Sequence, residues 1–287
     1  MTAIMELRGV HYRYQANADV LAGLDLSIGQ GEIVGLLGRN GAGKTTMLHL
    51  AMGLLTPAAG DVSVFGMSPQ KFGVEVKRRI GFVSEQQVLP PMMAVAQVLD
   101  YHRNLFPTWD DELLKQLMER FPLPLRNRVR SLSKGQARQL ALLCALAHKP
   151  DLLILDEPGG GLDPAARREF LETSIHMLNQ CGTTIVFSSH HMTDVERMAS
   201  RIVLLEDGNA LIDADLDDVR ENYCVASADN RDALQGVDTC LRVRQRGSTW
   251  NAVCLGSTEK IQQQLPQAHC RAVPLEELFV ELLGAEV

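Results

Sequence analysis

Short apolar runs separated by turn residues fill the first third of the chain, and this pattern predicts strands. The runs occupy residues 4–14, 21–28, 32–38, 60–66 and 79–84. The third run is short and apolar, ends on glycine and is followed by an apolar helical pattern that begins near Lys44. We therefore expect an opening sheet, then a buried strand that leads directly into a helix.

The middle of the chain carries a different period. Residues 92–130 have apolar positions at helical spacing, interrupted by prolines, which predicts a helical insertion. Two fully apolar strands follow at 151–158 and 184–190, with helical sequence between them. Such strands, joined by helices, are typical of a parallel sheet with crossover connections. The fold class expected here is α/β.

The last third begins with a predicted hairpin at 201–213, around Asp207-Gly208. From residue 222, short alternating stretches precede a helix at 275–284, in which four residues share one apolar face: Leu275, Leu278, Phe279 and Leu282. We predict a main domain at 1–216, with a helical subdomain at about 88–149, and a small C-terminal α+β accessory domain at 217–287.

Charge and composition narrow the choice of partners. The 287 residues include 28 Lys+Arg and 35 Asp+Glu, a formal net charge of -7, which argues against nucleic acid as the main partner. No segment approaches the roughly 20 apolar residues that a membrane-spanning helix needs. Any connection to a membrane is therefore expected to come through a partner.

The chain has six cysteines but no Cys-x-x-Cys pair and no secretory signal before them, which favours a reducing, cytosolic compartment. Four of them lie late in the chain, at Cys224, Cys240, Cys254 and Cys270. A metal site or disulfides among these four remain open. Small buried hydrophobes are the favoured interpretation.

One glycine-rich loop carries the strongest chemical signal. The stretch GRNGAGKTT matches G-x-x-x-x-G-K-[ST], directly after a predicted strand and before a helix. Glycines let backbone N–H groups converge on an anion, the helix adds its unpaired N-terminal donors, and the lysine neutralises outer phosphates. The predicted nucleotide-binding residues are Gly38, Arg39, Asn40, Gly41, Ala42, Gly43, Lys44, Thr45 and Thr46.

A second signal follows the apolar strand LLIL, which delivers Asp156 and Glu157 to its carboxyl end. Open parallel sheets bind ligands at that edge, so both carboxylates are expected beside the loop. Asp156 and the Thr45 hydroxyl are predicted to hold Mg²⁺ with ATP, and Glu157 to polarise a water in line with the outer phosphate. The alternative is that Asp156-Glu157-Pro158 merely ends a strand and caps a helix.

With GRNGAGKTT, LSKGQ and LLILDEP in this order, residues 1 to about 216 resemble the ATP-binding cassette (ABC) family, the motor subunits of ABC transporters. The resemblance implies a P-loop NTPase core with an antiparallel β subdomain and a helical insertion. It also implies a head-to-tail homodimer, in which the signature of one subunit closes over ATP held by the other. That signature comprises Ser133, Lys134, Gly135 and Gln136.

Other roles carried over from the family are an adenine-stacking aromatic at Tyr14 and a phosphate-sensing histidine at His190, the latter chosen over His191 by strand register. The alternative interpretation is that Tyr14 is an ordinary strand tyrosine and that Ser133 only caps a helix.

Three departures from the family pattern stand out. Glu85 occupies the usual glutamine position and Gln86 follows it, so the metal-site ligand is Glu85 or Gln86. Gly159-Gly160-Gly161 precedes the retained dimer-loop residue Asp163, and three glycines predict a mobile loop. Arg138-Gln139 reverses the order common in relatives.

The resemblance is to ATPase subunits of bacterial exporters whose transmembrane permease is a separate chain. It implies a cytoplasmic protein held on the inner face of the membrane by that permease, with residues 89–93 at the contact. The alternative is a soluble ATP switch that regulates another protein through its C-terminal domain. The transported substrate cannot be deduced, because the family's ATPase subunits do not contact it.

Overall fold

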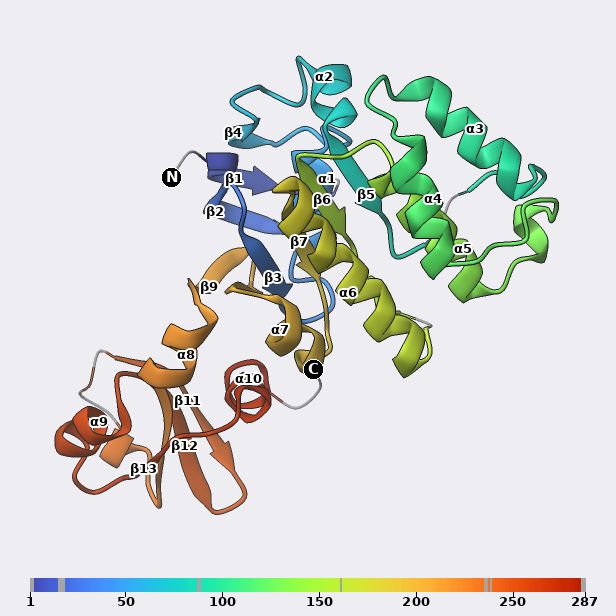
Figure 1. Cartoon of the computed structure of the whole chain (residues 1–287). Coiled ribbons are helices and arrows are strands. Elements are labelled where there is room, and N and C mark those ends of the chain that lie inside the picture. Colours follow the sequence, from blue (N-terminus) through green and yellow to red (C-terminus); the bar gives the residue numbers. More distant parts are fainter. Residues whose placement is uncertain are drawn as a thin grey trace.

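The computed structural model describes residues 3–14, 19–86, 89–160, 162–234, 237 and 239–284, and its strands form three sheets (Figure 1). The three-stranded antiparallel sheet has the order β2-β1-β4, from β1 (Ala3–Tyr12), β2 (Leu21–Gly29) and β4 (Ala59–Val64). The six-stranded sheet has the order β5-β6-β7-β3-β8-β9. Its strands are β3 (Ile33–Leu37), β5 (Ile80–Val83), β6 (Leu152–Leu155), β7 (Thr184–Ser188), β8 (Arg201–Glu206) and β9 (Asn209–Asp215).

The six-stranded sheet is parallel from β5 to β8, and β9 closes it as the antiparallel partner of β8. This confirms the α/β class and the hairpin predicted around Asp207-Gly208. Because β6, β7 and β3 are neighbours and run the same way, the segments that follow them meet at one edge of the sheet.

Helices cover both faces of this sheet and extend beyond its β5 edge. They are α1 (Lys44–Ala51), α2 (Gly73–Arg78), α3 (Val95–Leu105), α4 (Asp111–Arg120), the short η1 (Val129–Ser131), α5 (Lys134–Leu146), α6 (Pro164–Cys181) and α7 (Met192–Met198). The predicted helical insertion is present: α3 ends just before Phe106-Pro107 and α4 ends just before Phe121-Pro122.

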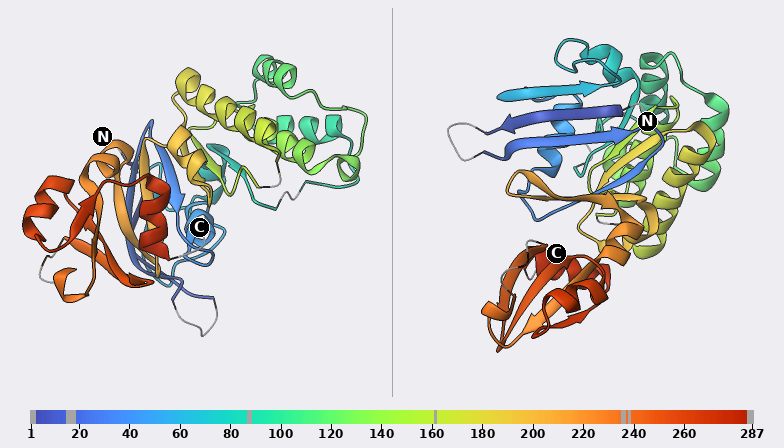
Figure 2. Two further views of the ribbon diagram at one scale, coloured as in Figure 1. Left: turned by 90° about the horizontal axis from the view of Figure 1, so that it is seen from below. Right: turned by 90° about the vertical axis from the view of Figure 1, so that its left-hand side faces the viewer.

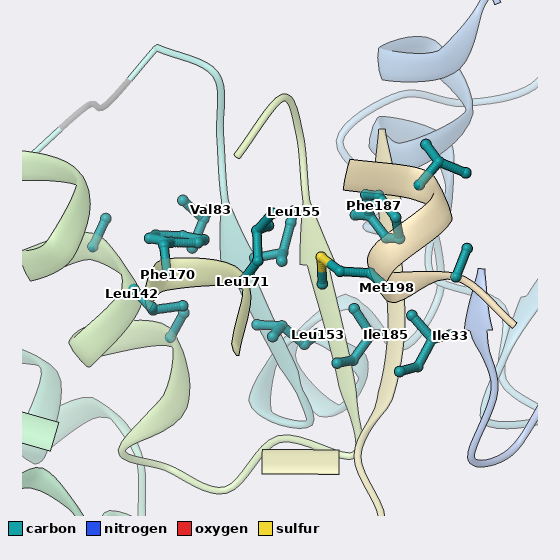
Figure 3. Close-up of a cluster of buried hydrophobic side chains, with 14 of the residues drawn as sticks. Ile33, Val83, Leu142, Leu153, Leu155, Phe170, Leu171, Ile185, Phe187 and Met198 are labelled. Atoms are coloured by element: carbon teal, nitrogen blue, oxygen red, sulfur yellow. The ribbon is translucent and has the colours of Figure 1, made fainter. Parts of the chain in front are cut away.

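Alternation along the buried strands builds two apolar layers. In β6, Leu153 and Leu155 face one cluster with Phe170 of α6, while Ile154 faces another beneath the three-stranded sheet and α1. Figure 3 shows the first layer, where Phe170 of α6 and Met198 of α7 lie among side chains of the strands. Strands buried on both faces give the carboxyl edge a rigid base.

The C-terminal sheet, defined as β10–β13, has the order β11-β12-β10-β13 and is antiparallel. Figure 2 shows it at the opposite end of the molecule from α3 and α4. The elements of this region are α8 (Leu216–Asn222), β10 (Tyr223–Ala228), η2 (Asp232–Leu234), β11 (Cys240–Arg246), β12 (Thr249–Leu255), α9 (Thr258–Gln264), β13 (His269–Arg271) and α10 (Leu275–Leu283).

The two faces of the C-terminal sheet pack differently. Val225 and Val253 join α10 in the same buried cluster as the main domain, whereas the other face packs on Ile261 and Leu265 at α9. All four apolar residues expected on one face of the last helix are buried. The predicted boundary between residues 216 and 217 falls in the first turn of α8, and it stays a prediction.

Candidate nucleotide-binding site

The loop between β3 and α1 depends on glycine at both ends. Gly38 has φ 146°, and a Cβ there would lie 2.5 Å from the carbonyl oxygen of Leu205. Gly43 has φ 99°, and a Cβ there would lie 2.6 Å from Leu21 Cδ2. In the described part of the chain, no side chain caps the first turn of α1. The backbone N–H groups of that turn are therefore available to an anion.

Lys44 places a buried cation inside this loop. Its side chain is 8% exposed, and Nζ donates to the carbonyl oxygens of Gly38 at 2.6 Å and Arg39 at 3.3 Å. Burial lowers the pKa of Lys44, while the carboxylates of Glu157 and Asp156 act in the opposite direction. The carbonyl oxygens of Gly38 and Arg39 thus fix the position of the Lys44 ammonium within the loop.

Asp156 lies at the centre of a hydrogen-bond network at the carboxyl edge of the six-stranded sheet. The Thr45 hydroxyl donates to Oδ2 of Asp156 at 2.9 Å, and the Ser188 hydroxyl donates to Oδ1 at 2.7 Å. Ser188 Oγ also accepts from the backbone N–H of Glu157 at 2.8 Å. Asp156 is 2% exposed, so β7 fixes the carboxylate and leaves it facing Thr45. A hydroxyl and a carboxylate side by side are the hard oxygen donors that Mg²⁺ prefers.

Glu157 and His190 lie in direct contact. Nδ1 of His190 is 2.6 Å from Oε2 of Glu157, and Glu157 adopts φ 48°, an uncommon conformation for a residue with a side chain. The Glu157 side chain is 15% exposed and that of His190 is 45% exposed. The Glu157 carboxylate lines the same cavity as Lys44 and Asp156, where it can take a proton from a water.

These groups line one cavity of about 820 Å³, a volume suited to a small-molecule ligand. It is bordered by the whole loop 38–46 together with Tyr14, Glu85, Asp156, Glu157 and His190. The Tyr14 hydroxyl lies 3.3 Å from Thr46 Oγ1, which holds the ring at the cavity rim. Of the two alternatives for the glutamine position, Glu85 lines this cavity, whereas Gln86 lines a neighbouring groove.

The signature residues occupy the N-terminus of α5. The Ser133 hydroxyl accepts from the N–H of Gln136 at 3.1 Å, and the Gln136 side chain accepts from the N–H of Ser133 at 3.0 Å. Gly135 lies in the first turn of the same helix, as does the exposed Lys134. Within the described part of the chain, none of these four residues lines the cavity around 38–46.

The dimer-loop residue Asp163 caps α6, since its Oδ1 accepts from the N–H groups of Ala165 and Ala166, both at 3.0 Å. Gly161, the third glycine of the predicted mobile loop, lies outside the described residues.

Sequence reasoning missed the role of Arg138. This side chain is 4% exposed and donates to the carbonyl oxygens of Pro158 at 3.1 Å and Glu85 at 2.8 Å, and also to that of Gly160. It therefore ties the signature helix to both loops that flank the cavity. The Arg138-Gln139 order departs from the family pattern at this position, but it does not indicate these contacts.

A second missed residue is Leu283 of α10, which lines the cavity from the C-terminal region. Nearby, Arg242 of β11 pairs with Glu206 of β8 and donates to the carbonyl oxygen of Leu282 at 2.9 Å. The C-terminal region therefore contacts the site, although every sequence motif lies upstream of it.

Comparisons with known proteins agree on one family. A family model described as ABC transporter matches residues 21–160. The ABC transporter ATP-binding protein YtrB of Bacillus subtilis is 35% identical, over 77% of this chain and 75% of its own length. Nod factor export ATP-binding protein I of Cupriavidus pinatubonensis is 33% identical, over 100% of this chain and 93% of its own. A solved ATP-binding subunit of an ABC transporter superposes with a TM-score of 0.70 at 27% identity, over 76% of this chain and 92% of that one.

In the part of the chain that the structure describes, no helix combines the length and apolar character needed to cross a bilayer.

Proposed function

This chain belongs to the family of ABC transporter ATP-binding proteins and hydrolyses ATP, and on that premise we propose that it drives an exporter as a homodimer bound to separate permease chains. One observation carries the proposal. The loop at 38–46, Asp156, Glu157 and His190 share one cavity, whereas the signature at 133–136 lies elsewhere in the same chain.

The chemistry follows from the groups around that cavity. Lys44 and the N-terminus of α1 would bind the outer phosphates of ATP. Thr45 and Asp156 would hold Mg²⁺, and Glu85 is better placed than Gln86 to join them. The bound ion supplies charge neutralisation at the phosphates. Glu157 would take the proton of the attacking water, and His190 would orient that carboxylate and contact the outer phosphate.

The homodimer accounts for the signature. Among the described residues, those at the N-terminus of α5 do not line the nucleotide cavity of their own chain, yet this helix N-terminus carries Ser133 and Gly135 and is suited to an anion. A second copy of the chain, turned head to tail, would bring its α5 against ATP. Asp163, at the exposed start of α6, would lie in that interface.

The permease contact is supported by a groove of about 690 Å³ between β5 and the helices α3 and α5. Apolar side chains of Phe82, Leu89, Leu105 and Phe106 line it, and of the predicted contact segment 89–93 Leu89 contributes directly. Thr45, Glu85 and Asp156 line both this groove and the nucleotide cavity. An apolar helical segment of the permease bound in this groove would therefore lie against residues that also line the nucleotide cavity.

The direction of transport rests on similarity to a protein named for export. The protein named for Nod factor export aligns with this chain along its whole length, including the C-terminal sheet, which supports an exporter. The accessory domain at 217–287 would then be part of the motor.

The groove provides the test. Leu105→Glu places a charge in the groove, and Leu105 is 48% exposed, so the fold should tolerate it. Leu255→Glu is the matched control, a leucine 41% exposed in β12. Membranes from cells that express the natural permease partner should retain the wild type and Leu255→Glu but release Leu105→Glu. Basal ATP hydrolysis by Leu105→Glu should equal that of the wild type. Equal retention of both variants would contradict the proposed contact.

A soluble ATP switch is the second candidate, and the contact of Leu283 with the cavity favours it. A C-terminal region that lines the nucleotide cavity could report the presence of ATP to another protein. The same fractionation distinguishes the two functions, because a switch of this kind would leave the wild type off the membrane.

A further inference from the structure

The face of the C-terminal sheet that packs on α9 carries a row of thiols with no part in the nucleotide chemistry. We propose that Cys240 and Cys254 form a reversible disulfide by exchange with a low-molecular-weight disulfide.

The strand register brings these thiols together. Cys254 of β12 is directly opposite Cys240 of β11 on one side and Cys224 of β10 on the other. Residues directly opposite in an antiparallel pair have Cα atoms about 4.5 to 5.5 Å apart, within the roughly 4.4 to 6.8 Å that a disulfide spans. The sulfur atoms of Cys240 and Cys254 are 2.7 Å apart. A bond between them therefore requires no movement of either strand.

Access selects Cys240 as the first thiol to react. Cys224 and Cys254 are fully buried, whereas Cys240 is half-buried at the start of the outermost strand. The hydrogen bond from the Cys254 thiol lowers the pKa of Cys240, while burial raises the pKa of Cys224 to about 11. The thiolate is the nucleophile, so the more accessible of these thiols, Cys240, is also the one that ionises more readily.

A metal site is the competing use of clustered thiols. Among the described residues, no group of three or more His, Cys, Asp or Glu side chains is arranged to hold a metal ion. The buried cysteines pack instead with Ile261 and Leu265, as small hydrophobes do. The geometry therefore favours a two-thiol reaction.

The exchange balances without any other reactant. The Cys240 thiolate attacks the small disulfide RSSR, forms a mixed disulfide and releases RS⁻. Cys254 then loses its proton and attacks Sγ of Cys240, which releases a second RS⁻ and closes the protein disulfide. The two protons lost by the protein convert both leaving groups to RSH, so the protein is oxidised by two electrons and RSSR is reduced.

The bond would fasten the strand that ties the C-terminal sheet to the main domain. Arg242 lies two residues beyond Cys240 on β11 and pairs with Glu206 of β8. The strand register shifts between Cys240 and Arg242, and a link at Cys240 would hold this irregular end of β11 against β12.

The test uses the full chain, reduced and then exposed to oxidised glutathione. Remaining thiols are alkylated, and tryptic peptides are mapped by mass spectrometry without reduction. Trypsin separates the four thiols, because it cuts at Arg231, Arg242, Arg246 and Lys260. We expect one species in which the peptides of Cys240 and Cys254 are linked, and dithiothreitol should release them.

Three single variants identify the pair. Cys224→Ala and Cys270→Ala should still form the link, whereas Cys240→Ser should lose it. A Cys224–Cys254 link, or a Cys240 that stops at the mixed disulfide or stays alkylated while its chain is folded, would overturn the proposal. The wild-type map decides the matter even if a variant fails to fold.

Discussion

Two helices of this chain begin with a small residue followed by lysine, yet their N-termini are satisfied in opposite ways. At α1, the residue before the helix is Gly43, no side chain among the described residues accepts from the first turn, and Lys44 is 8% exposed. At α5, the Ser133 hydroxyl and the Gln136 side chain each accept a hydrogen bond from the other's backbone, and the lysine, Lys134, is exposed to solvent.

This difference in capping indicates that α1 and α5 contribute to ATP binding in different ways. An N-terminus without a side-chain cap keeps its donors for a ligand, so α1 is built to hold phosphate within its own chain. An N-terminus with a reciprocal cap is stable alone, so α5 can remain ordered in a single subunit. Our account is that α5 meets phosphate only when a second subunit brings ATP to it.

Glu157→Gln should have the largest effect on the chemistry that both helices surround. The amide keeps the shape but cannot take a proton, so turnover should fall by roughly 10²- to 10⁴-fold while ATP binding persists. With hydrolysis blocked, ATP-dependent dimers should accumulate, as size-exclusion chromatography would report. Glu172→Gln, at an exposed position of α6, is the control. Wild-type turnover in Glu157→Gln would remove this residue from the chemistry.

Lys44→Ala and Lys134→Ala compare the two lysines directly. Removing the buried cation leaves the phosphates without their partner, a loss of about 2 to 5 kcal/mol in binding free energy. The exposed Lys134 should contribute little to ATP binding by an isolated subunit. Calorimetric titration of monomers measures both constants. Equal losses of ATP affinity in the two variants would contradict the proposed difference between the two helix N-termini.

Arg138→Leu tests how α5 is held in position. The change leaves three carbonyl oxygens without their donor, so the free energy of unfolding should drop by about 1 to 3 kcal/mol. Urea denaturation measures the loss, and Arg168→Leu on the exposed side of α6 should change stability far less. Matching values for the two variants would show that the Arg138 contacts carry no stability.

Ser133→Ala should have the smallest effect on stability, about 1 kcal/mol for a lost cap. Ser133→Asp sharpens the comparison, because aspartate caps helices as well as serine does. Ser133→Asp should therefore be as stable as the wild type. If α5 faces phosphate in the dimer, the added carboxylate should nevertheless suppress ATP hydrolysis. If Ser133 is only a cap, Ser133→Asp should hydrolyse ATP like the wild type.

The parts of this protein that sequence predicts well are those whose determinants are local. Gly38 to Thr45 specify a turn and a helix start by themselves, and Asp156 follows an apolar strand whose end must reach the same edge. The contacts of Arg138 could not be predicted, since its acceptors lie 20, 22 and 53 residues away in loops.

The same limit applies to the C-terminal region. The pairing of Cys240 with Cys254 depends on a register shift within β11, which spacing alone does not reveal. The approach of Leu283 to the cavity depends on how α10 packs in the main cluster. Contacts between distant segments decide both, and the apolar pattern within one segment does not identify its distant partner.

The most direct test of action between subunits combines two inactive variants, Lys44→Ala and Gly135→Asp, in one dimer. A side chain at Gly135 fits, because a Cβ there would lie 3.4 Å from Leu162 Cδ2, an ordinary contact. Its carboxylate would repel phosphate and block closure. If α5 acts across the dimer, both lesions fall in one site and the other site is intact, so the defined heterodimer should sequester one ATP while neither parent homodimer sequesters any. A heterodimer that traps no nucleotide, under conditions where wild-type dimers do, would contradict the account.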